Sequence, residues 1–231
     1  MKLVNKHVYE SLTREDGGPD GRKYVDPVGN KLPSVTTILD KTKSDESKQA
    51  LAAWRRSIGE KKAAEITKEA AFRGTMMHSY LERYLKGENP KPGTNFYHQH
   101  SFKMAKVLID SYLDPFLDEA WGLETGLYYP SLYAGTTDMV GVYQGEPSII
   151  DFKQSNKIKT DNRVIDYKLQ LVAYMMAHNK IYDTDIKQGV ILMCTKDLEP
   201  QRWILSGAEL EEYKEKWWTR VAQYYDVDGD A

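Results

Sequence analysis

Apolar and polar positions in the first half of the chain follow the spacing of helices. Residues 48–85 are rich in Ala and predict a mostly helical segment, with Gly59 as a break and Gly87 as its stop. A further helix is predicted over residues 100–120, where Pro115 would break or kink it. This half is therefore expected to be mainly helical.

The first forty residues show a different pattern. The stretch "TREDGGPDGRKYVDPVGNKLP" is dense in Gly, Pro, Asp and Asn, which indicates turns around a short strand at Lys23–Val25. Pro33 and Ser34 then predict the start of a short helix that runs through Leu39, with Ser34 as its cap.

From Leu123 onward the pattern changes to short β-rich runs. A helix is predicted between them over residues 163–180, and a final helix over residues 208–225 carries apolar and aromatic residues along one face. The predicted strands cover residues 123–130, 134–144, 148–153, 187–195 and 202–206. The order of elements predicts a single α/β domain over residues 1–231, with a helical part at 1–120 and an α/β core at 121–231.

Composition narrows the class of protein. Hydrophobic residues make up 41% of the chain and charged residues 29%, and no apolar run approaches the roughly 18 residues of a membrane helix. The opening resembles neither a secretory signal nor a transit peptide, so a cytoplasmic location is expected, in a bacterium or a virus-infected cell. One cysteine, Cys194, allows no internal disulfide and no iron–sulfur cluster. The net charge of −2 means that a polyanionic partner must be held by a local basic patch or by metal ions.

The segment "TTDMVGVYQGEPSIIDFKQS" carries the candidate chemistry. A two-residue loop at Gln144 and Gly145 would pair Asp138 with Asp151, whereas a four-residue loop would pair Asp138 with Lys153. In both registers the two acids and the lysine share one face, because strand side chains alternate.

Two carboxylates on one face repel each other unless something compensates. A divalent cation is the natural compensator, and carboxylate oxygens suit Mg²⁺ or Mn²⁺. The alternative is a surface hairpin in which Lys153 pairs with an exposed acid. The apolar run before Asp151 favours a strand that enters the core, and therefore the metal site.

Two helices carry further candidates. Gln170 and Tyr174 are four residues apart, on one face of the helix that follows the second acid. His78 and Glu82 show the same spacing on an earlier helix. Taken alone, each pair is also compatible with an ordinary structural or solvated helix face.

Together these motifs resemble the PD-(D/E)XK nuclease superfamily and its RecB-like branch. The resemblance is carried by "RGTMMH", "GTTD", "IIDFK" and "QLVAY", which occur in that order over residues 73–174. With "PSVTTIL" before the helices, the resemblance is closer still to the group of mitochondrial genome maintenance exonucleases and their phage relatives. The resemblance implies a restriction-endonuclease-like core, in which a central mixed sheet is flanked by helices and preceded by a helical N-terminal half.

The resemblance also implies roles for individual residues. Lys153 matches the lysine that orients the attacking water and offsets charge on the phosphate, and Gln170 and Tyr174 match the helix motif that supports it. Gln154 replaces the small residue usual after that lysine. The metal ligands implied are His78, Asp138, Asp151 and the carbonyl of Phe152.

The implied substrate is DNA. Candidate contacts near the motifs are Arg73, Lys157, Lys159, Arg163 and Lys168, and Arg55, Arg56, Lys61 and Lys62 are candidates on the N-terminal helices. We predict a monomeric Mg²⁺- or Mn²⁺-dependent exonuclease that prefers single-stranded DNA with a free end. A structure-selective or nicking endonuclease on the same fold, and an inactive DNA-binding accessory protein, are the alternatives.

Overall fold

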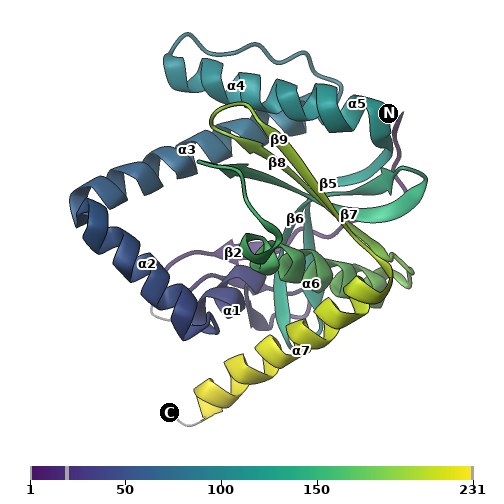
Figure 1. Cartoon of the computed structure of the whole chain (residues 1–231). Coiled ribbons are helices and arrows are strands. Elements are labelled where there is room, and N and C mark those ends of the chain that lie inside the picture. The colour runs from purple at the N-terminus through teal and green to yellow at the C-terminus, as the bar shows by residue number, and fades with distance from the viewer. Residues whose placement is uncertain (1, 19–20, 230–231) are drawn as a thin grey trace.

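A central six-stranded sheet lies between two layers of helices in the computed structural model of the protein, which describes residues 2–18 and 21–229 (Figure 1). The strand order is β1-β5-β6-β7-β8-β9, with β1 parallel to β5, β7 parallel to β8, and the other neighbours antiparallel. The strands are β1 (Lys2–Leu3), β5 (Leu117–Tyr129), β6 (Tyr133–Tyr143), β7 (Glu146–Ser155), β8 (Gln188–Thr195) and β9 (Pro200–Leu205). The predicted mixed sheet with flanking helices is therefore confirmed.

Alternating residues of β6 and β7 supply two separate cores. Val140 and Ile149 face one side of the sheet, and Met139 and Ile150 face the other; all four are fully buried. This is the period-two alternation expected of a sheet covered on both faces. Because both faces are buried, a shift of one residue would reverse every side chain, so the strand register is strongly specified.

The first layer of helices covers the face of Val140, and we call its interior the α6 core. It contains α1 (Val35–Lys41), α6 (Ile165–Tyr182) and α7 (Gly207–Gly229). Ser34 caps α1 as predicted, since its hydroxyl accepts a hydrogen bond from Thr37 N at 3.0 Å. The predicted buried face of α7 is confirmed at Leu210, Tyr213, Trp217, Val221 and Tyr224.

The second layer covers the face of Met139, and we call its interior the α3 core. It contains α3 (Glu60–Leu85) and α4 (Phe96–Leu108), followed by a π-helical turn at Ile109–Leu113 and the short α5 (Asp114–Phe116). The predicted continuation of this helix to Ala120 is wrong, because β5 already begins at Leu117, which pairs with Tyr143. Cys194 of β8 is buried in this core, and burial raises the pKa of its thiol to about 12.

Two parts lie outside the layers. Helix α2 (Asp45–Ile58) has no buried residue and meets α3 at Gly59, whose φ of 83° is easily adopted by glycine. In Figure 1 it runs from the start of α3 back toward α1. The short strands β2 (Thr13–Glu15), β3 (Lys23–Val25) and β4 (Lys31–Pro33) form a small antiparallel sheet. The strand predicted at 23–25 is confirmed, whereas residues 19–20 of the turn-rich stretch lie outside the described residues.

None of the described helices is long and apolar enough to span a membrane.

Candidate active site

The β6–β7 hairpin sets the position of the candidate acids. Gln144 and Gly145 form a two-residue loop with φ of 54° and 82°, the left-handed conformations that a type I′ turn requires. Tyr143 therefore pairs with Glu146, and the ladder runs to Met139 and Ile150. The next positions along the two strands are Asp138 and Asp151, so the first of the two predicted registers is the observed one.

Asp138 is held by groups from two other elements. Its Oδ2 accepts a hydrogen bond from Phe152 N at 2.6 Å, and its Oδ1 lies 3.3 Å from Nδ1 of His78 on α3. Burial alone would raise the pKa of Asp138, but His78, the Lys153 ammonium and the Phe152 N–H together outweigh it and lower the pKa. In return, the carboxylate outweighs the effect of burial on His78 and raises the pKa of the imidazole.

Asp151 lies deeper, with only 2% of its surface exposed. Burial, together with the negative charge of Asp138, raises the pKa of Asp151 to about 6, although Lys153 opposes this shift from 2.5 Å away. For Lys153, burial would lower the pKa, but the two carboxylates outweigh it and raise the pKa. The structure thus brings two acids and one ammonium together in a partly desolvated space.

Helix α6 supports Lys153 from the other side. The Lys153 ammonium donates to Gln170 Oε1 at 3.1 Å, and Gln170 Nε2 donates to the Tyr174 hydroxyl at 3.3 Å. Tyr174 fits because Gly135 leaves room for it: a Cβ at position 135 would lie 2.7 Å from the tyrosine ring. The chain Lys153–Gln170–Tyr174 therefore orients the ammonium toward Asp151.

Glu124 joins this group, and the sequence analysis did not identify it. Since Leu123 pairs with Met139 and Thr125 with Thr137, Glu124 lies opposite Asp138 on the neighbouring strand. Glu124 is exposed at the surface, yet partial loss of its surrounding water, together with the charge of Asp138, raises the pKa of its carboxyl group to about 7. Only the register of β5 on β6 indicates this position, and that register shifts twice before Leu123.

The donor set suits a divalent cation. Ligand atoms of His78, Glu124 and Asp138 all lie within 4.8 Å of one another, and Asp151 follows on the next strand. Carboxylate and imidazole groups are suitable ligands for Mn²⁺, and carboxylates for Mg²⁺. The residues present therefore fit the predicted metal ion, while the role of the Phe152 carbonyl stays a prediction.

A cleft of about 830 Å³ begins where β7 leaves the site. It is reached through Gln154, the residue after Lys153, and through Tyr167, whose ring centre lies 5.1 Å from the Lys153 ammonium. The four candidate basic residues that line it are Arg73, Lys157, Lys159 and Arg163, to which the structure adds Lys196. Trp54 of α2 and Ile66 of α3 form part of the opposite wall.

The basic candidates are not all in this cleft. Lys168 is buried, and its ammonium pairs with Glu209 at 2.6 Å, so the structure does not bring it to the cleft. Its position four residues before Val172, on the buried face of α6, was visible in the sequence. Arg55 and Arg56 line a separate hollow of about 390 Å³ between α1 and α2, and Lys61 and Lys62 line neither.

Arg73 forms one edge of the cleft through contacts with β7 and the residues after it. Its Nε donates to Gln154 Oε1 at 3.2 Å, and its Nη2 donates to Asn156 Oδ1. Burial lowers the pKa of Arg73, although Glu69 opposes the shift. Arg73 thus ties α3 to the end of β7 next to Lys153.

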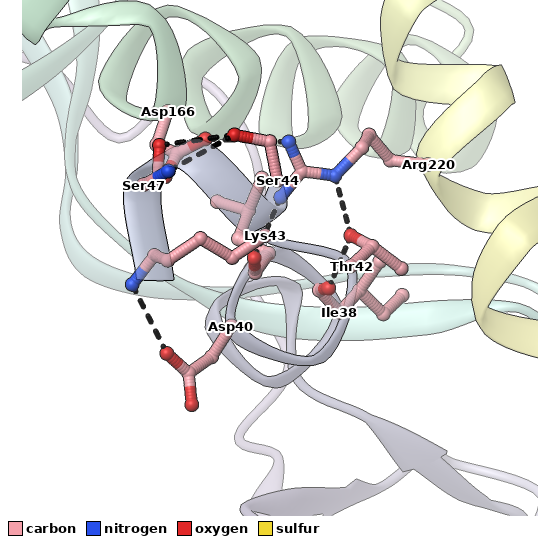
Figure 2. A network of polar contacts seen from close by, with 9 residues as sticks. Ile38, Asp40, Thr42, Lys43, Ser44, Ser47, Asp166 and Arg220 are labelled. Atoms are coloured by element: carbon pink, nitrogen blue, oxygen red, sulfur yellow. Dashed lines mark hydrogen bonds and ion pairs between the residues drawn. The ribbon is translucent and has the colours of Figure 1, made fainter. Parts of the chain in front are cut away.

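A polar network holds the junction between α1 and α2 (Figure 2). Arg220 of α7 donates to the Leu39 carbonyl at 2.6 Å and to the Thr42 hydroxyl, and its guanidinium lies 3.5 Å from Asp166 of α6. Ser44 caps α2 by accepting from Ser47 N at 3.3 Å. The end of α1, two residues before the Ser44 cap of α2, is therefore held to the α6 core, while α2 itself is exposed.

Comparisons with known proteins give the context for this geometry. No family model matches the chain. Mitochondrial genome maintenance exonuclease 1 of Mus musculus is 32% identical over 207 residues, which cover 84% of this chain and 59% of the mouse protein. The Homo sapiens protein of the same name is 29% identical over 204 residues, with 84% and 58% covered. The chain thus spans a little under three fifths of the length of these curated relatives.

Among solved structures, that of an exonuclease candidate from Eubacterium rectale has a TM-score of 0.47 and 14% identity, covering 67% of this chain and 65% of that one. This likeness is too low to assign a fold or a function. The mouse and human proteins match 84% of this chain, and this share includes residues 73–174, which carry the four motifs. The predicted resemblance is confirmed: the chain is similar to the mitochondrial genome maintenance exonucleases over most of its length.

Proposed function

We propose that this protein is a Mg²⁺- or Mn²⁺-dependent DNA exonuclease that acts on single strands with a free end. The observation that carries the proposal is the meeting of Asp138, Asp151 and Lys153 on one hairpin, with His78 and Gln170 in contact with them. The names of the similar proteins support an exonuclease that acts on DNA. Both acids are withdrawn from water and close to each other, an arrangement that a bound cation would stabilise.

In the proposed reaction, His78, Asp138, Asp151 and the Phe152 carbonyl hold the cation. When bound, the cation supplies Lewis-acid chemistry, which polarises the scissile phosphate and makes water more acidic. Lys153 orients the attacking water and offsets negative charge on the phosphate. Gln170 accepts a hydrogen bond from the Lys153 ammonium and Tyr174 accepts one from Gln170, so these two side chains would hold the ammonium next to the phosphate.

The cleft supports DNA as the substrate. Its basic side chains would bind phosphates, and the rings of Trp54 and Tyr167 are available for stacking with bases. These contacts carry no base-specific pattern, so cleavage without sequence specificity is expected. A strand that enters between α2, α3 and the residues after β7 would reach Lys153 through Gln154 and Tyr167.

The deciding experiment compares linear and closed circular single-stranded DNA at equal concentration. With Mg²⁺ or Mn²⁺ the linear strand should be degraded from an end and the circle should persist, and excess EDTA should stop degradation of the linear strand. Asp151→Asn protein prepared in parallel controls for a contaminating nuclease. Equal initial rates on both substrates would make the protein an endonuclease. Binding without cleavage under all metal conditions would favour the accessory-protein alternative.

A further inference from the structure

Three carboxylates lie side by side on three neighbouring strands. Glu124 of β5 is opposite Asp138 of β6, and Asp138 is followed by Asp151 on β7. The family motifs in the sequence account for the second and third acids only. Glu124 therefore extends the row on the side of Asp138 that faces away from Lys153.

The backbone at Glu124 departs from ordinary strand geometry. Its φ is 48°, in the left-handed region that residues other than glycine, asparagine and aspartate seldom adopt. The neighbouring residues Leu123 and Thr125 remain paired with β6, so the departure is confined to this single position. A glycine or asparagine would suit the backbone better, and the glutamate side chain is not explained by local conformational preference.

The surroundings of Glu124 contain ligand atoms of His78 and Asp138, while the charges of His78 and Lys86 act on it without a close ion pair. Its carboxylate lies within 4.8 Å of ligand atoms of both His78 and Asp138, which is close enough for one ion to contact all three. Within the described part of the chain, no ion pair is formed by Glu124. By contrast Glu82, one helical turn after His78, pairs with Lys86 at 2.6 Å.

We propose that Glu124 is a further protein ligand of the divalent cation, bound on the His78 side of Asp138. The inference rests on the proposed function, because it adds a ligand to the same metal centre. A set of one imidazole and neighbouring carboxylates suits Mn²⁺ and is less suited to Ca²⁺, which takes six to eight oxygen ligands. Glu124 would then raise the affinity of the site for a small divalent ion before DNA binds.

The test measures metal binding in the absence of DNA, so that no turnover is needed. Mn²⁺ affinity is determined by calorimetry and by the electron paramagnetic resonance signal of free Mn²⁺, for the wild type, Glu124→Gln and Glu124→Asn. The asparagine variant is included because it tolerates the left-handed backbone. Glu82→Gln is the matched control, since it removes a nearby negative charge without removing a proposed ligand.

We expect both Glu124 variants to weaken Mn²⁺ binding by about tenfold or more, the scale seen when groups that support metal sites are removed. Glu82→Gln should change the Mn²⁺ affinity by less than about threefold, because it removes only a surface charge that is screened by solvent. Thermal melting without metal identifies any variant that fails to fold. If one Glu124 variant fails, the Mn²⁺ affinity of the other one tests the inference.

Equal Mn²⁺ affinity in the wild type and both folded Glu124 variants would overturn the inference and leave the proposed function standing. An equal loss in Glu82→Gln would reduce Glu124 to a source of negative charge and also overturn it. Absence of Mn²⁺ binding by the wild type would instead contradict the proposed metal dependence itself.

Discussion

The β6–β7 hairpin and helix α2 border the same cleft, but they are held in place in different ways. The hairpin lies between two cores, and Val140, Ile149 and Ile150 have no exposed surface. Helix α2 has no buried residue; the Arg220 network holds the chain at Thr42, shortly before α2 begins, and the chain turns into α3 at Gly59. Packing thus positions the proposed reacting groups, whereas the opposite wall of the cleft depends on a few polar contacts.

This difference matches the demands of the proposed reaction. Hydrolysis needs the two acids and Lys153 at constant separations, because small displacements of reacting groups lower the rate strongly. A passing strand presents bases of different sizes, and an exposed helix can adjust to them at little cost in free energy. The comparison therefore predicts that changes in the hairpin affect chemistry and changes around α2 affect binding.

The largest effect is expected from Asp151→Asn. Loss of this carboxylate should lower the rate of DNA hydrolysis on the order of a thousandfold, which corresponds to about 4 kcal/mol of transition-state stabilisation. Single-stranded DNA should still bind within a few-fold of the wild type, as measured by fluorescence anisotropy without metal. Asp185→Asn, which changes an exposed acid paired with Lys187, is the control and should leave the rate unchanged. A parallel loss of rate and affinity would contradict the division between the two regions.

Hydrogen exchange tests the comparison directly. Backbone amides of Met139 and Ile150 should be protected by at least about 3 kcal/mol more than those in the middle of α2, since only the former require opening of the sheet. Mass spectrometry of exchanged peptides gives this difference. Similar protection in α2 would mean that the helix is held by more than its two ends.

A third region, remote from the cleft, makes the stability of the fold depend on pH. His178 of α6 is buried, with Nε2 3.1 Å from the Tyr9 hydroxyl and Nδ1 2.8 Å from the Thr184 hydroxyl. Burial, and to a smaller extent His7, lowers the pKa of His178 to about 4. In the unfolded chain this histidine binds its proton near pH 6.5. The neutral His178 therefore contributes fully to the stability of the fold above pH 6.5, and this contribution is lost as the pH falls toward 4.

We expect the free energy of unfolding to fall by about 2 kcal/mol from this group between pH 7.5 and pH 5. Urea unfolding at the two pH values measures the loss, and His178→Gln should remove most of it. His100→Gln, at a half-buried position of α4 outside the His178 cluster, should leave the pH dependence of stability as in the wild type. If His178→Gln retains the full dependence, other groups control the acid stability.

The smallest effect is expected from a single cation of the cleft. Lys157→Ala should weaken binding of single-stranded DNA about threefold and reduce the slope of log affinity against log salt by about 0.7, since one phosphate contact is lost. The rate at saturating DNA should not change. Lys180→Ala, at the exposed end of α6, provides the control. A slope unchanged from the wild type would exclude Lys157 from the path of the strand.

Turn residues and helix spacing in the sequence predicted the parts of the site that lie within one hairpin or one helix. The two-residue turn at Gln144 and Gly145 allowed the pairing of Asp138 with Asp151 to be stated as one of two registers. The spacing of Gln170 and Tyr174 likewise fixed their common helix face. In both cases a short segment determines the relative positions, so no information about distant contacts was needed.

Long-range pairing explains what the sequence did not predict. Glu124 reaches Asp138 only after the register of β5 on β6 has shifted twice, and no local pattern indicates either shift. The helix expected to reach Ala120 ends early, because pairing of Leu117 with Tyr143 outweighs helix propensity. Lys168 was assigned to DNA from its charge and its position near the motifs, although its helix face turns it toward Glu209.

The burial of Cys194 in β8 has a practical consequence for spectroscopy. This thiol has no exposed surface, and a pKa of about 12 leaves almost no thiolate at neutral pH, so maleimide reagents should not modify it. Since the sequence contains one cysteine, thiols introduced on α2 and on the residues after β7 can be labelled selectively in the otherwise native chain. A pair of fluorophores at these positions would report the width of the cleft in solution, molecule by molecule, as a DNA strand enters and leaves.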